Sequence, residues 1–306
     1  MKKAIQSLRH FLAVQRRVWI GKRNPRKLAS INYLGAMKKE MNWESPQDLN
    51  EKIMWLKFNS DTTEWTRLAD KYRVREYIKG KGYEDILVPL IGCWEKVDDI
   101  DFEQLPEKYV LKTNNGAGSV IIVKDKTKED IPLFKRLLQK WMNEDFGLLH
   151  AEPHYSAIKP LIIAEKLLED TGDLPSASLV DYKMWCLNGK LFGTWATYDR
   201  KGFIAKTEWH DLEWNYRPEW SVYTEHYQDG GGIIPRPKNY ERMVKIAEDL
   251  SAGFPQVRVD LYNINGQIYF GELTFSSAGG CNNFFTQEVL DIMGSLIPLP
   301  EKQVHQ

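Results

Sequence analysis

The sequence predicts an α+β fold, in which sheets are built mainly from neighbouring strands and helices pack against them. Two strand pairs with apolar residues at every second position are joined by the tight-turn dipeptides Asn188-Gly189 and Asn265-Gly266. Segments with helical periodicity, such as residues 130–143, lie between groups of strands. A chain of 306 residues with 42% hydrophobic residues suffices for two packed subdomains and a large core.

The individual elements follow from the same local patterns. Apolar residues at helical spacing predict helices at residues 45–60 (opened by Ser45-Pro46), 62–79, 130–143 and 239–252. Alternating or β-branched apolar runs predict strands at residues 86–94, 108–112, 119–123, 161–167, 181–187, 190–197 and in the hairpin 257–275. Residues 200–237 are rich in aromatic, polar, glycine and proline residues, so we expect a loop-like region there.

The last hairpin carries the most informative polar residues. A two-residue turn at Asn265-Gly266 would place Val259 opposite Glu272 and mix apolar with charged side chains on one face. A three-residue loop shifts the pairing by one residue, so that Val259 shares a face with Leu273. Because one face must be buried, we expect the second register, which gathers four polar residues on the other face: Arg258, Asp260, Glu272 and Thr274.

The carboxylates of that polar face allow two interpretations. Asp260 and Glu272 repel each other when they lie side by side, unless a cation lies between them. From the hairpin alone, a metal site and a solvated face with a salt bridge to Arg258 are equally compatible. Asp181 and Lys183 are similarly ambiguous, since alternation places them on one face as either a site pair or an exposed ion pair.

A glycine-containing segment, Asn114-Asn115-Gly116-Ala117-Gly118-Ser119, joins two predicted strands. It is neither a P-loop nor a dinucleotide-binding turn, because both of those run into a helix and use a different glycine spacing. Its glycines let backbone N–H groups close over an anion, and Lys112, just before it, supplies a positive charge to the same phosphates. A hairpin with a flexible glycine turn is the alternative.

Two further features also leave alternatives open. Asp99-Ile100-Asp101 resembles the metal-binding Asp-x-Asp of many glycosyltransferases, but it lies in an acidic connector without a preceding hydrophobic strand. The region 195–223 concentrates aromatic residues, which form either a lid that stacks on sugar rings or an ordinary aromatic subcore; they are Trp195, Tyr198, Trp209, Trp214, Tyr216, Trp220 and Tyr223.

The first 39 residues form a basic arm, with eleven lysine or arginine residues and no acidic residue. The rest of the chain carries 31 basic and 42 acidic residues. The overall net charge of zero therefore conceals a basic arm and an acidic body. Apolar residues recur at helical spacing within the arm, which predicts a basic amphipathic N-terminal helix. This helix can lie on an anionic membrane surface, dock on the acidic body or bind a partner; we expect no nucleic acid, because the body is acidic.

The remaining composition indicates where the protein acts. No run of 18 apolar residues is present, and the N-terminus shows no secretory signal pattern. Cys93, Cys186 and Cys281 lie far apart, which indicates a reducing compartment and neither a zinc motif nor a disulfide framework. We therefore expect a cytoplasmic protein, peripheral at the inner membrane surface if residues 1–27 bind lipid.

Taken together, these pieces resemble an ATP-grasp enzyme, and more closely the TupA-like branch, which is found with cell-surface polysaccharide and teichuronopeptide synthesis. The matching phrases occur in order over about residues 48–280, which is more specific than any single motif. They are Leu49-Asn-Glu-Lys52, Ala69-Asp-Lys-Tyr-Arg-Val-Arg-Glu76, Val110-Leu-Lys-Thr-Asn-Asn-Gly-Ala-Gly118, Asp181-Tyr-Lys183, Arg258-Val-Asp-Leu-Tyr262 and Phe270-Gly-Glu-Leu-Thr-Phe275.

The resemblance implies ATP and Mg²⁺ as cofactors and a role for each matched residue. Phosphate-binding and lid residues would be Lys71, Lys112, Asn115, Gly116, Gly118 and Ser119. The hinge that reads adenine would contain Glu165, Lys166 and Leu168, and Asp181 would hold the ribose. Mg²⁺ ligands would be Asp260, Glu272 and Thr274, with Thr274 standing where many relatives have Asn, which puts a second metal in doubt. Arg258 and Lys183 would act on the acceptor or the transferred phosphoryl group.

The resemblance also implies a domain plan and a reaction. The basic arm at 1–39 would precede a helical region at 40–106, a lid subdomain at 107–164 and a C-terminal subdomain with the metal site at 165–306, so that two α+β subdomains clasp the nucleotide. The implied reaction is ATP-dependent ligation of a carboxylate, from an acidic glycan or uronic-acid precursor, to an amine such as an amino acid. A sugar kinase of the same fold and a glycosyltransferase are the alternatives.

Overall fold

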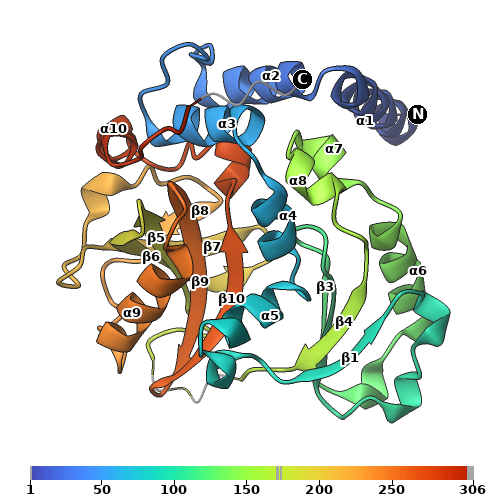
Figure 1. The fold of residues 1–306 in the computed structure, drawn as a ribbon. Helices are drawn as coiled ribbons and strands as arrows, with labels where there is room; N and C mark the ends of the chain where they lie inside the picture. Colours follow the sequence, from blue (N-terminus) through green and yellow to red (C-terminus); the bar gives the residue numbers. More distant parts are fainter. Residues whose placement is uncertain (1, 170–171, 173, 302–306) are drawn as a thin grey trace.

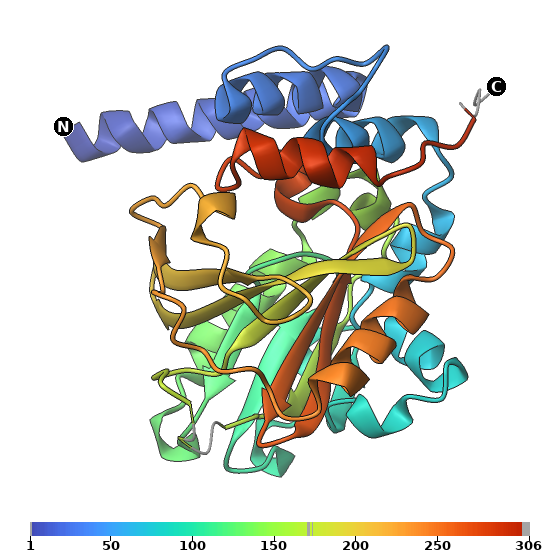
Figure 2. The same ribbon diagram turned by 90° about the vertical axis from the view of Figure 1, so that its left-hand side faces the viewer.

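The computed structural model describes residues 2–169, 172 and 174–301, and it confirms the α+β class (Figures 1 and 2). Two sheets of mainly antiparallel strands face each other, and the helices α4 (Thr63–Ala69) and α5 (Val74–Gly80) lie between them in this view (Figure 1). Each sheet has its own hydrophobic cluster of buried residues. The architecture is therefore two bodies, each with a sheet and a core, that share one central space.

The smaller sheet has four antiparallel strands in the order β1-β4-β2-β3. Their bounds are β1 (Leu90–Trp94), β2 (Tyr109–Thr113), β3 (Val120–Val123) and β4 (Ile162–Lys166). One face buries Tyr109 and Leu111 beneath the helix α6 (Ile131–Met142). Lys112 alternates with these residues and therefore points to the opposite face, toward the larger sheet.

The larger sheet has six strands in the order β10-β9-β5-β6-β7-β8, and only β7 and β8 run parallel. Their bounds are β5 (Asp181–Leu187), β6 (Lys190–Lys201), β7 (Ile204–His210), β8 (Tyr227–Asp229), β9 (Gln256–Ile264) and β10 (Gln267–Thr274). Helix α9 (Tyr240–Ser251) packs its apolar stripe against β5, β6 and β9. This sheet contributes the carboxylates of the predicted site.

The prediction of a loop-like region at 200–237 is wrong, because the segment contains β7 and β8. The polar residues Thr207 and Glu208 are buried in β7, which hides its strand pattern in the sequence. Glu208 is satisfied there by the Tyr198 hydroxyl (2.5 Å) and by two backbone N–H groups. A buried acidic residue with this many partners replaces the apolar residue that the pattern would require.

The aromatic residues of 195–223 form a subcore, so the alternative of a glycan-facing lid is wrong for most of them. Trp195, Trp209 and Trp220 are buried, and their rings stack or meet edge to face with Phe192, Phe284 and Phe285. Rings packed against one another in a core cannot stack on a sugar.

Helix boundaries differ from the predictions at two places. The predicted helix 62–79 is interrupted between α4 and α5, because the buried Asp70 carboxylate accepts hydrogen bonds from the N–H groups of Tyr72 (2.8 Å) and Arg73 (3.1 Å). Lys71 lies at this interruption. Helix α3 (Leu49–Asn59) begins with Asp48 as its N-cap rather than at Ser45-Pro46, since Asp48 accepts from the Glu51 N–H (2.8 Å).

The predicted N-terminal helix is present as α1 (Lys2–Arg23), and a second helix, α2 (Pro25–Met37), follows it directly. The two lie side by side across one end of the molecule, above α7 (Phe146–His150), α8 (Pro153–Ser156) and α10 (Gln287–Ser295) (Figures 1 and 2). Arg17 anchors α1 by donating to the Leu149 carbonyl oxygen (2.9 Å). In the described part of the chain, no helix has the length and apolar character needed to cross a membrane.

Short 3-10 turns complete the described elements: η1 (Glu84–Ile86), η2 (Val97–Asp99), η3 (Phe102–Gln104), η4 (Lys126–Lys128), η5 (Pro218–Trp220) and η6 (Ser277–Gly280). Asp99 ends η2 and is exposed, whereas Asp101 caps η3 by accepting from the Glu103 N–H (3.0 Å). The Asp-x-Asp of the sequence is thus divided between two turns.

The register of the last hairpin is as predicted, but its cause is different. Ile264 pairs with Gln267, so the turn has two residues and the predicted three-residue loop is wrong. A β-bulge at Gly271, between Phe270 and Glu272, shifts the pairing instead. Beyond the bulge Leu273 pairs with Val259 and Glu272 with Asp260, which places both carboxylates side by side.

Gly271→Ala tests the bulge. A Cβ at this position would lie 2.9 Å from the Asp260 carbonyl oxygen, so the strand must shift. We expect the free energy of unfolding to fall by about 1–3 kcal/mol, measured by urea denaturation. The control is Gly80→Ala, where an added Cβ meets nothing within 4 Å; it should be neutral or stabilising by up to about 1 kcal/mol. Equal stability of the two variants would contradict the proposed role of the bulge.

Candidate active site

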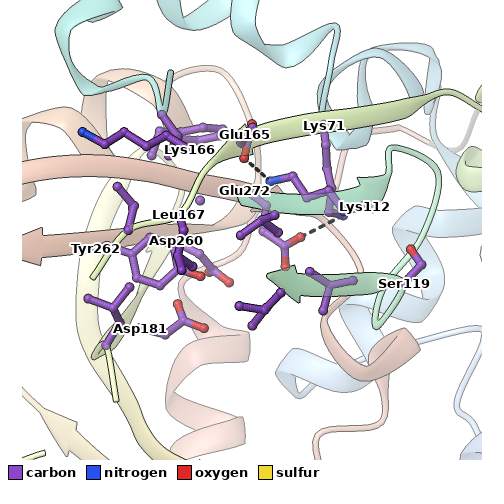
Figure 3. Close-up of a pocket in the computed structure, with 18 of the residues that line it drawn as sticks. Lys71, Lys112, Ser119, Glu165, Lys166, Leu167, Asp181, Asp260, Tyr262 and Glu272 are labelled. Carbon is purple, nitrogen blue, oxygen red and sulfur yellow. Dashed lines mark ion pairs between the residues drawn. The ribbon is translucent and has the colours of Figure 1, made fainter. Parts of the chain in front are cut away.

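A cavity of about 400 Å³ lies between the two sheets (Figure 3). Its apolar wall is formed by Val88, Val110, Val120, Ile122, Leu179 and Phe270. Most residues predicted for the site line it as well: Lys71, Lys112, Gly116, Gly118, Ser119, Glu165, Lys166, Leu168, Asp181, Asp260 and Glu272. Residues from both bodies therefore meet at one cavity, with an apolar part and a strongly charged part.

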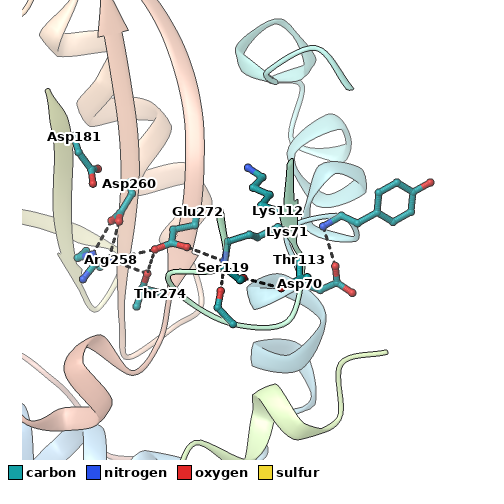
Figure 4. Close-up of polar contacts among 12 residues, drawn as sticks. Asp70, Lys71, Lys112, Thr113, Ser119, Asp181, Arg258, Asp260, Glu272 and Thr274 are labelled. Atoms are coloured by element: carbon teal, nitrogen blue, oxygen red, sulfur yellow. Dashed lines mark hydrogen bonds and ion pairs between the residues drawn. The ribbon is translucent and has the colours of Figure 1, made fainter. Parts of the chain in front are cut away.

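Lys71 connects the two sides of this cavity. Its ammonium group donates to the Gly116 carbonyl oxygen (2.7 Å) and forms an ion pair with Glu272 (3.1 Å) (Figure 4). The backbone N–H of Lys71 also donates to the Asn114 carbonyl oxygen (3.3 Å). Lys71, at the interruption between α4 and α5, thus joins the glycine loop (residues 114–119) to the Glu272 carboxylate on β10.

Glu165 on β4 holds a second charged group at the cavity. Its carboxylate pairs with Lys112 (2.6 Å) and with Arg75 (3.3 Å), and Arg75 also donates to the Val88 carbonyl oxygen (2.9 Å). Val110 pairs with Glu165 in the sheet, so Lys112 is its diagonal neighbour on the same face. Lys112 is thereby fixed at the edge of the cavity (Figure 3).

The glycine loop has a rigid base. The Thr113 and Ser119 hydroxyls are hydrogen-bonded (2.7 Å), and the buried Asn114 exchanges hydrogen bonds with the backbone of Leu161 (2.7 Å) and Lys159 (3.1 Å). Between these anchors Gly118 has φ +78°, a conformation that favours glycine. Asn115 is buried and borders a small hollow on the other side of the loop.

Asp260 lies at the centre of the charged cluster on the large sheet. Arg258 contacts both of its oxygens (2.7 Å each), and Lys183 donates to it (2.8 Å) as well as to Asp181 (2.5 Å). The other oxygen of Asp181, Oδ1, is buried without a hydrogen-bond partner within the described residues. Asp181 lines the cavity, and its Oδ1 lacks the hydrogen bond that a ligand hydroxyl would supply on reaching it.

Glu272 is the most accessible carboxylate of the cluster, with its side chain 32% exposed. Burial by itself would raise its pKa, but the charges of Lys71, Arg258 and Lys183 lower the pKa to about 2. Thr274 donates to Glu272 (3.3 Å) and accepts from Arg258 (3.1 Å), which completes a continuous network (Figure 4).

A second cavity, of about 580 Å³, lies on the other side of Glu272. Arg258 and Thr274 line this cavity rather than the first, and Glu272 lines both. Lys183 is buried beneath the charged cluster and lines neither of them. Glu272 therefore forms a wall shared by two spaces of comparable size.

The family model described as TupA-like ATP-grasp matches residues 51–298, which is most of the chain. The chain belongs to the TupA-like ATP-grasp family. This assignment confirms the resemblance deduced from the sequence motifs and the ATP-grasp fold, and it supports an ATP-dependent enzyme.

Solved structures similar to this ATP-grasp chain include two D-alanine–D-alanine ligases. The ATP complex from Bacillus anthracis has 16% identity and a TM-score of 0.42, covering 79% of this chain and 61% of that one. The enzyme from Helicobacter pylori has 13% identity and a TM-score of 0.42, covering 83% and 68%. The ATP-grasp ligase PsnB with its minimal precursor has 12% identity and a TM-score of 0.40, covering 80% and 66%.

The chain spans only about three fifths of the Bacillus anthracis ligases' length. No curated protein matched it.

The charged cluster of this ATP-grasp chain fits magnesium. Mg²⁺ is usually held by one or two carboxylates while phosphate oxygens and water complete its coordination. Asp260 and Glu272 supply that donor set, and no group of three or more His, Cys, Asp or Glu residues in the described ranges forms a closed metal site. Asp260 and Glu272 are each paired with two cations, and Glu272 is the freer ligand because its side chain is more exposed, 32% against 3%. Thr274 lines the second cavity, where its hydroxyl links Glu272 to Arg258.

Sequence reasoning missed several residues of the site. Arg75 belongs to the phrase that carries the resemblance, but its partner Glu165 is 90 residues away. Arg200 lines the cavity 3.8 Å from Asp181 and comes from a region predicted as loop. Tyr262 also lines the cavity and continues the Arg258–Asp260 alternation, so the strand pattern was the signal that could have found it.

Lys112→Met tests whether Lys112, which lines this cavity, contributes a positive charge to ATP binding. Loss of one charge-assisted contact should weaken ATP–Mg²⁺ binding by about 10–100-fold, measured by calorimetry. The matched control is Lys108→Met, since Lys108 precedes the same strand and forms only an exposed pair with Glu169 (2.9 Å). Unchanged ATP affinity in Lys112→Met would exclude Lys112 from the nucleotide site.

Proposed function

We propose that this chain is an ATP-dependent carboxylate–amine ligase that modifies an acidic cell-surface polysaccharide or its uronic-acid precursor. Membership of the TupA-like ATP-grasp family supports the ATP-dependent ligase class. The substrate proposal rests on the resemblance of the sequence to the branch associated with polysaccharide synthesis. ATP and Mg²⁺ are the cofactors, and the second substrate is an amine such as an amino acid.

The observation that carries the proposal is the position of Glu272. Its carboxylate borders both cavities and is paired with Lys71, which also holds the glycine loop. A nucleotide in the first cavity would direct its terminal phosphate toward this wall, and an acceptor in the second would meet it there. Positive charges from several segments neutralise the anions that must meet, which is the main requirement of phosphoryl transfer.

The reaction has two steps. A carboxylate oxygen of the acid attacks the terminal phosphorus of ATP, the bond to the bridging oxygen breaks and ADP leaves. The amine nitrogen then attacks the acyl carbon of the acylphosphate, inorganic phosphate leaves and the nitrogen loses a proton. Asp260 and Glu272 would hold Mg²⁺, which would supply positive charge to the phosphates.

The roles proposed for individual residues come from the family resemblance, and the positions of most of these residues around the first cavity support them. Lys71 and Lys112 bind phosphates, the loop residues Asn115, Gly116, Gly118 and Ser119 cover them, and Glu165, Lys166 and Leu168 form the adenine hinge. Asp181 receives a ribose hydroxyl at its free oxygen. Asp260 and Glu272 hold Mg²⁺ with Thr274 beside them, Arg258 steadies the transferred group, and Lys183 keeps Asp181 and Asp260 in position.

A sugar kinase of the same fold would use the same nucleotide site, so products decide between the two reactions. The glycosyltransferase alternative requires Asp99 and Asp101 to act together, and the capping role of Asp101 gives it no support. A ligase yields an amide and free phosphate, whereas a kinase yields a phosphoester without free phosphate.

We further propose that the enzyme is cytoplasmic and lies peripherally at an anionic inner membrane surface through residues 1–27. On α1 the exposed Leu12 and Trp19 share a helical stripe with Arg16 and Arg23, and the Arg23 guanidinium lies 4.1 Å from the Trp19 ring centre. Exposed apolar residues among basic ones suit such a surface.

Glu272→Ala tests the ligase proposal. With ATP, Mg²⁺, candidate uronic acids and amino acids, we expect ADP, free phosphate and an amide mass from the unaltered chain, and at least a ~100-fold slower ADP release from the variant. EDTA should have the same effect as the substitution. Circular dichroism checks that the variant is folded. Unchanged ATP turnover in Glu272→Ala would rule out the metal assignment, and a phosphoester product would indicate the kinase instead.

Trp19→Glu tests the membrane proposal. Removing one large apolar side chain from the interface should weaken sedimentation with phosphatidylglycerol vesicles by about tenfold, and high salt should weaken it further. The control is Phe203→Glu, which changes another exposed aromatic residue, 70% exposed, outside the arm. The membrane proposal fails if neither the Trp19 variant nor salt changes vesicle binding.

A further inference from the structure

The second cavity is assembled from segments far apart in the chain. Its floor is the loop around η6, its roof is formed by α1 and α2, and Glu272 closes the end toward the nucleotide cavity. Residues of the roof are Arg17, Ala29, Ile31, Asn32, Gly35 and Ala36. The roof residues precede residues 51–298, which the family model matches. Membership of the family therefore gives no role to the roof.

Lys57 places a buried positive charge in this cavity. Its side chain is only 3% exposed, and its ammonium donates one hydrogen bond, to the Gly279 carbonyl oxygen (2.8 Å), among the residues described. An ammonium group has three N–H donors, so two remain for a ligand. Burial lowers the pKa of Lys57, which reflects the cost of holding this charge without an anion in contact.

Glu152 places a buried carboxylate in the same cavity. One oxygen accepts a hydrogen bond from the Ser276 hydroxyl, and the other, Oε1, faces Gly279, where an added Cβ would lie 3.8 Å from it. Burial raises the pKa of Glu152 to about 7 against the opposing charge of Lys57. Within the described part of the chain, Lys57 and Glu152 form no ion pair with each other, and both line the cavity without a contacting counter-ion.

The two charges lie in a defined order along the floor. The chain runs from Thr274, which contacts Glu272, through Ser276, which contacts Glu152, to Gly279, which contacts Lys57. Tyr155 lines the cavity together with both carboxylates, and burial and then the charges of Glu152 and Glu272 raise its pKa. Both charges therefore lie along this loop, and the hydrogen bond to Glu152 comes from the residue that is closer in sequence to Thr274.

We propose that this cavity binds the amine donor as a zwitterion, with its ammonium group at Glu152 and its carboxylate at Lys57. The inference rests on the proposed ligase function and specifies the second substrate as a free amino acid. A zwitterion supplies the counter-charge that each buried group lacks. Its amino nitrogen would then lie toward Glu272, where the acyl carbon must be attacked, and its carboxylate would point away from the reaction.

Helix α2 completes the site by bounding the space for the donor's side chain. Gly35 and Asn32 line the cavity from above, and a Cβ added at Gly35 meets no atom within 4 Å. A large side chain at position 35 therefore has room and would occupy the cavity without disturbing the core.

Calorimetry on the full chain, saturated with ADP and Mg²⁺, tests the proposal without requiring turnover. The probes are glycine, D-alanine and the standard L-amino acids, followed by the carboxamides of those that bind. We expect at least one amino acid to bind and its carboxamide to bind at least about tenfold more weakly, because the amide lacks the charge that Lys57 recognises. Lys57→Met should bind the acid and the amide equally, and Glu152→Gln should bind both more weakly.

Matched variants separate these effects from general damage. Lys52→Met changes a lysine on the same helix that also donates to a backbone carbonyl, at Ile297 (2.8 Å), and lines neither cavity; it should bind the amino acid normally. Gly35→Phe should block amino-acid binding, whereas Gly80→Phe, at an equally open helical glycine, should not. All variants should bind ADP–Mg²⁺ with unchanged affinity.

The outcomes distinguish this inference from the ligase proposal. Absence of binding by every amino acid, or equal binding of acid and carboxamide to the unaltered chain, overturns the zwitterion site while ATP–Mg²⁺ binding and turnover still stand. Binding of glucuronate that depends on Lys57 overturns it too, since the cavity would then hold the carboxylate substrate. Failure of ATP–Mg²⁺ binding itself would instead contradict the ligase proposal.

Discussion

The charge balance around Glu272 is the constraint on which the site depends. Two carboxylates placed side by side by the sheet are tolerated because Lys71, Arg258 and Lys183 reach them from three separate segments. Lys71 also links Glu272 to the glycine loop, because its ammonium group donates a hydrogen bond to the Gly116 carbonyl oxygen. The position of that loop is consequently tied to the carboxylate that the nucleotide and its metal would share.

The parts of the fold that local patterns govern were predictable from sequence. Alternation located the strands around Leu111 and Val259, and the requirement for one buried face fixed the pairing of Leu273 with Val259. The structural feature that produces this pairing was not predictable, because a longer turn and a β-bulge both give the same final register. Gly271, an isolated glycine inside a strand, was the signal for the bulge.

The parts that depend on long-range packing were not predictable. Lys57 looks like an ordinary helix lysine and Glu152 like a loop residue, and neither has a partner at motif spacing. Only the tertiary fold brings them to the same loop, at Gly279 and Ser276. Strand β7 was missed for a related reason, since its buried Glu208 is stabilised by partners that local sequence does not reveal.

Under the proposed assignment of the two cavities, the residues for chemistry and those for substrate selection come from different parts of the chain. The nucleotide cavity is built within residues 51–298, which the family model covers, whereas the roof of the second cavity comes from α1 and α2, which precede it. Glu272 forms the common wall, and Ala117 of the glycine loop also lines the second cavity. A change of the roof would therefore alter which donor fits without moving the carboxylates, because α2 reaches the cavity but contributes no charge to the cluster around Asp260. Helix α1 also carries the basic and apolar residues proposed to meet the membrane, so an acceptor delivered there would lie close to the cavity in which its acid would be joined.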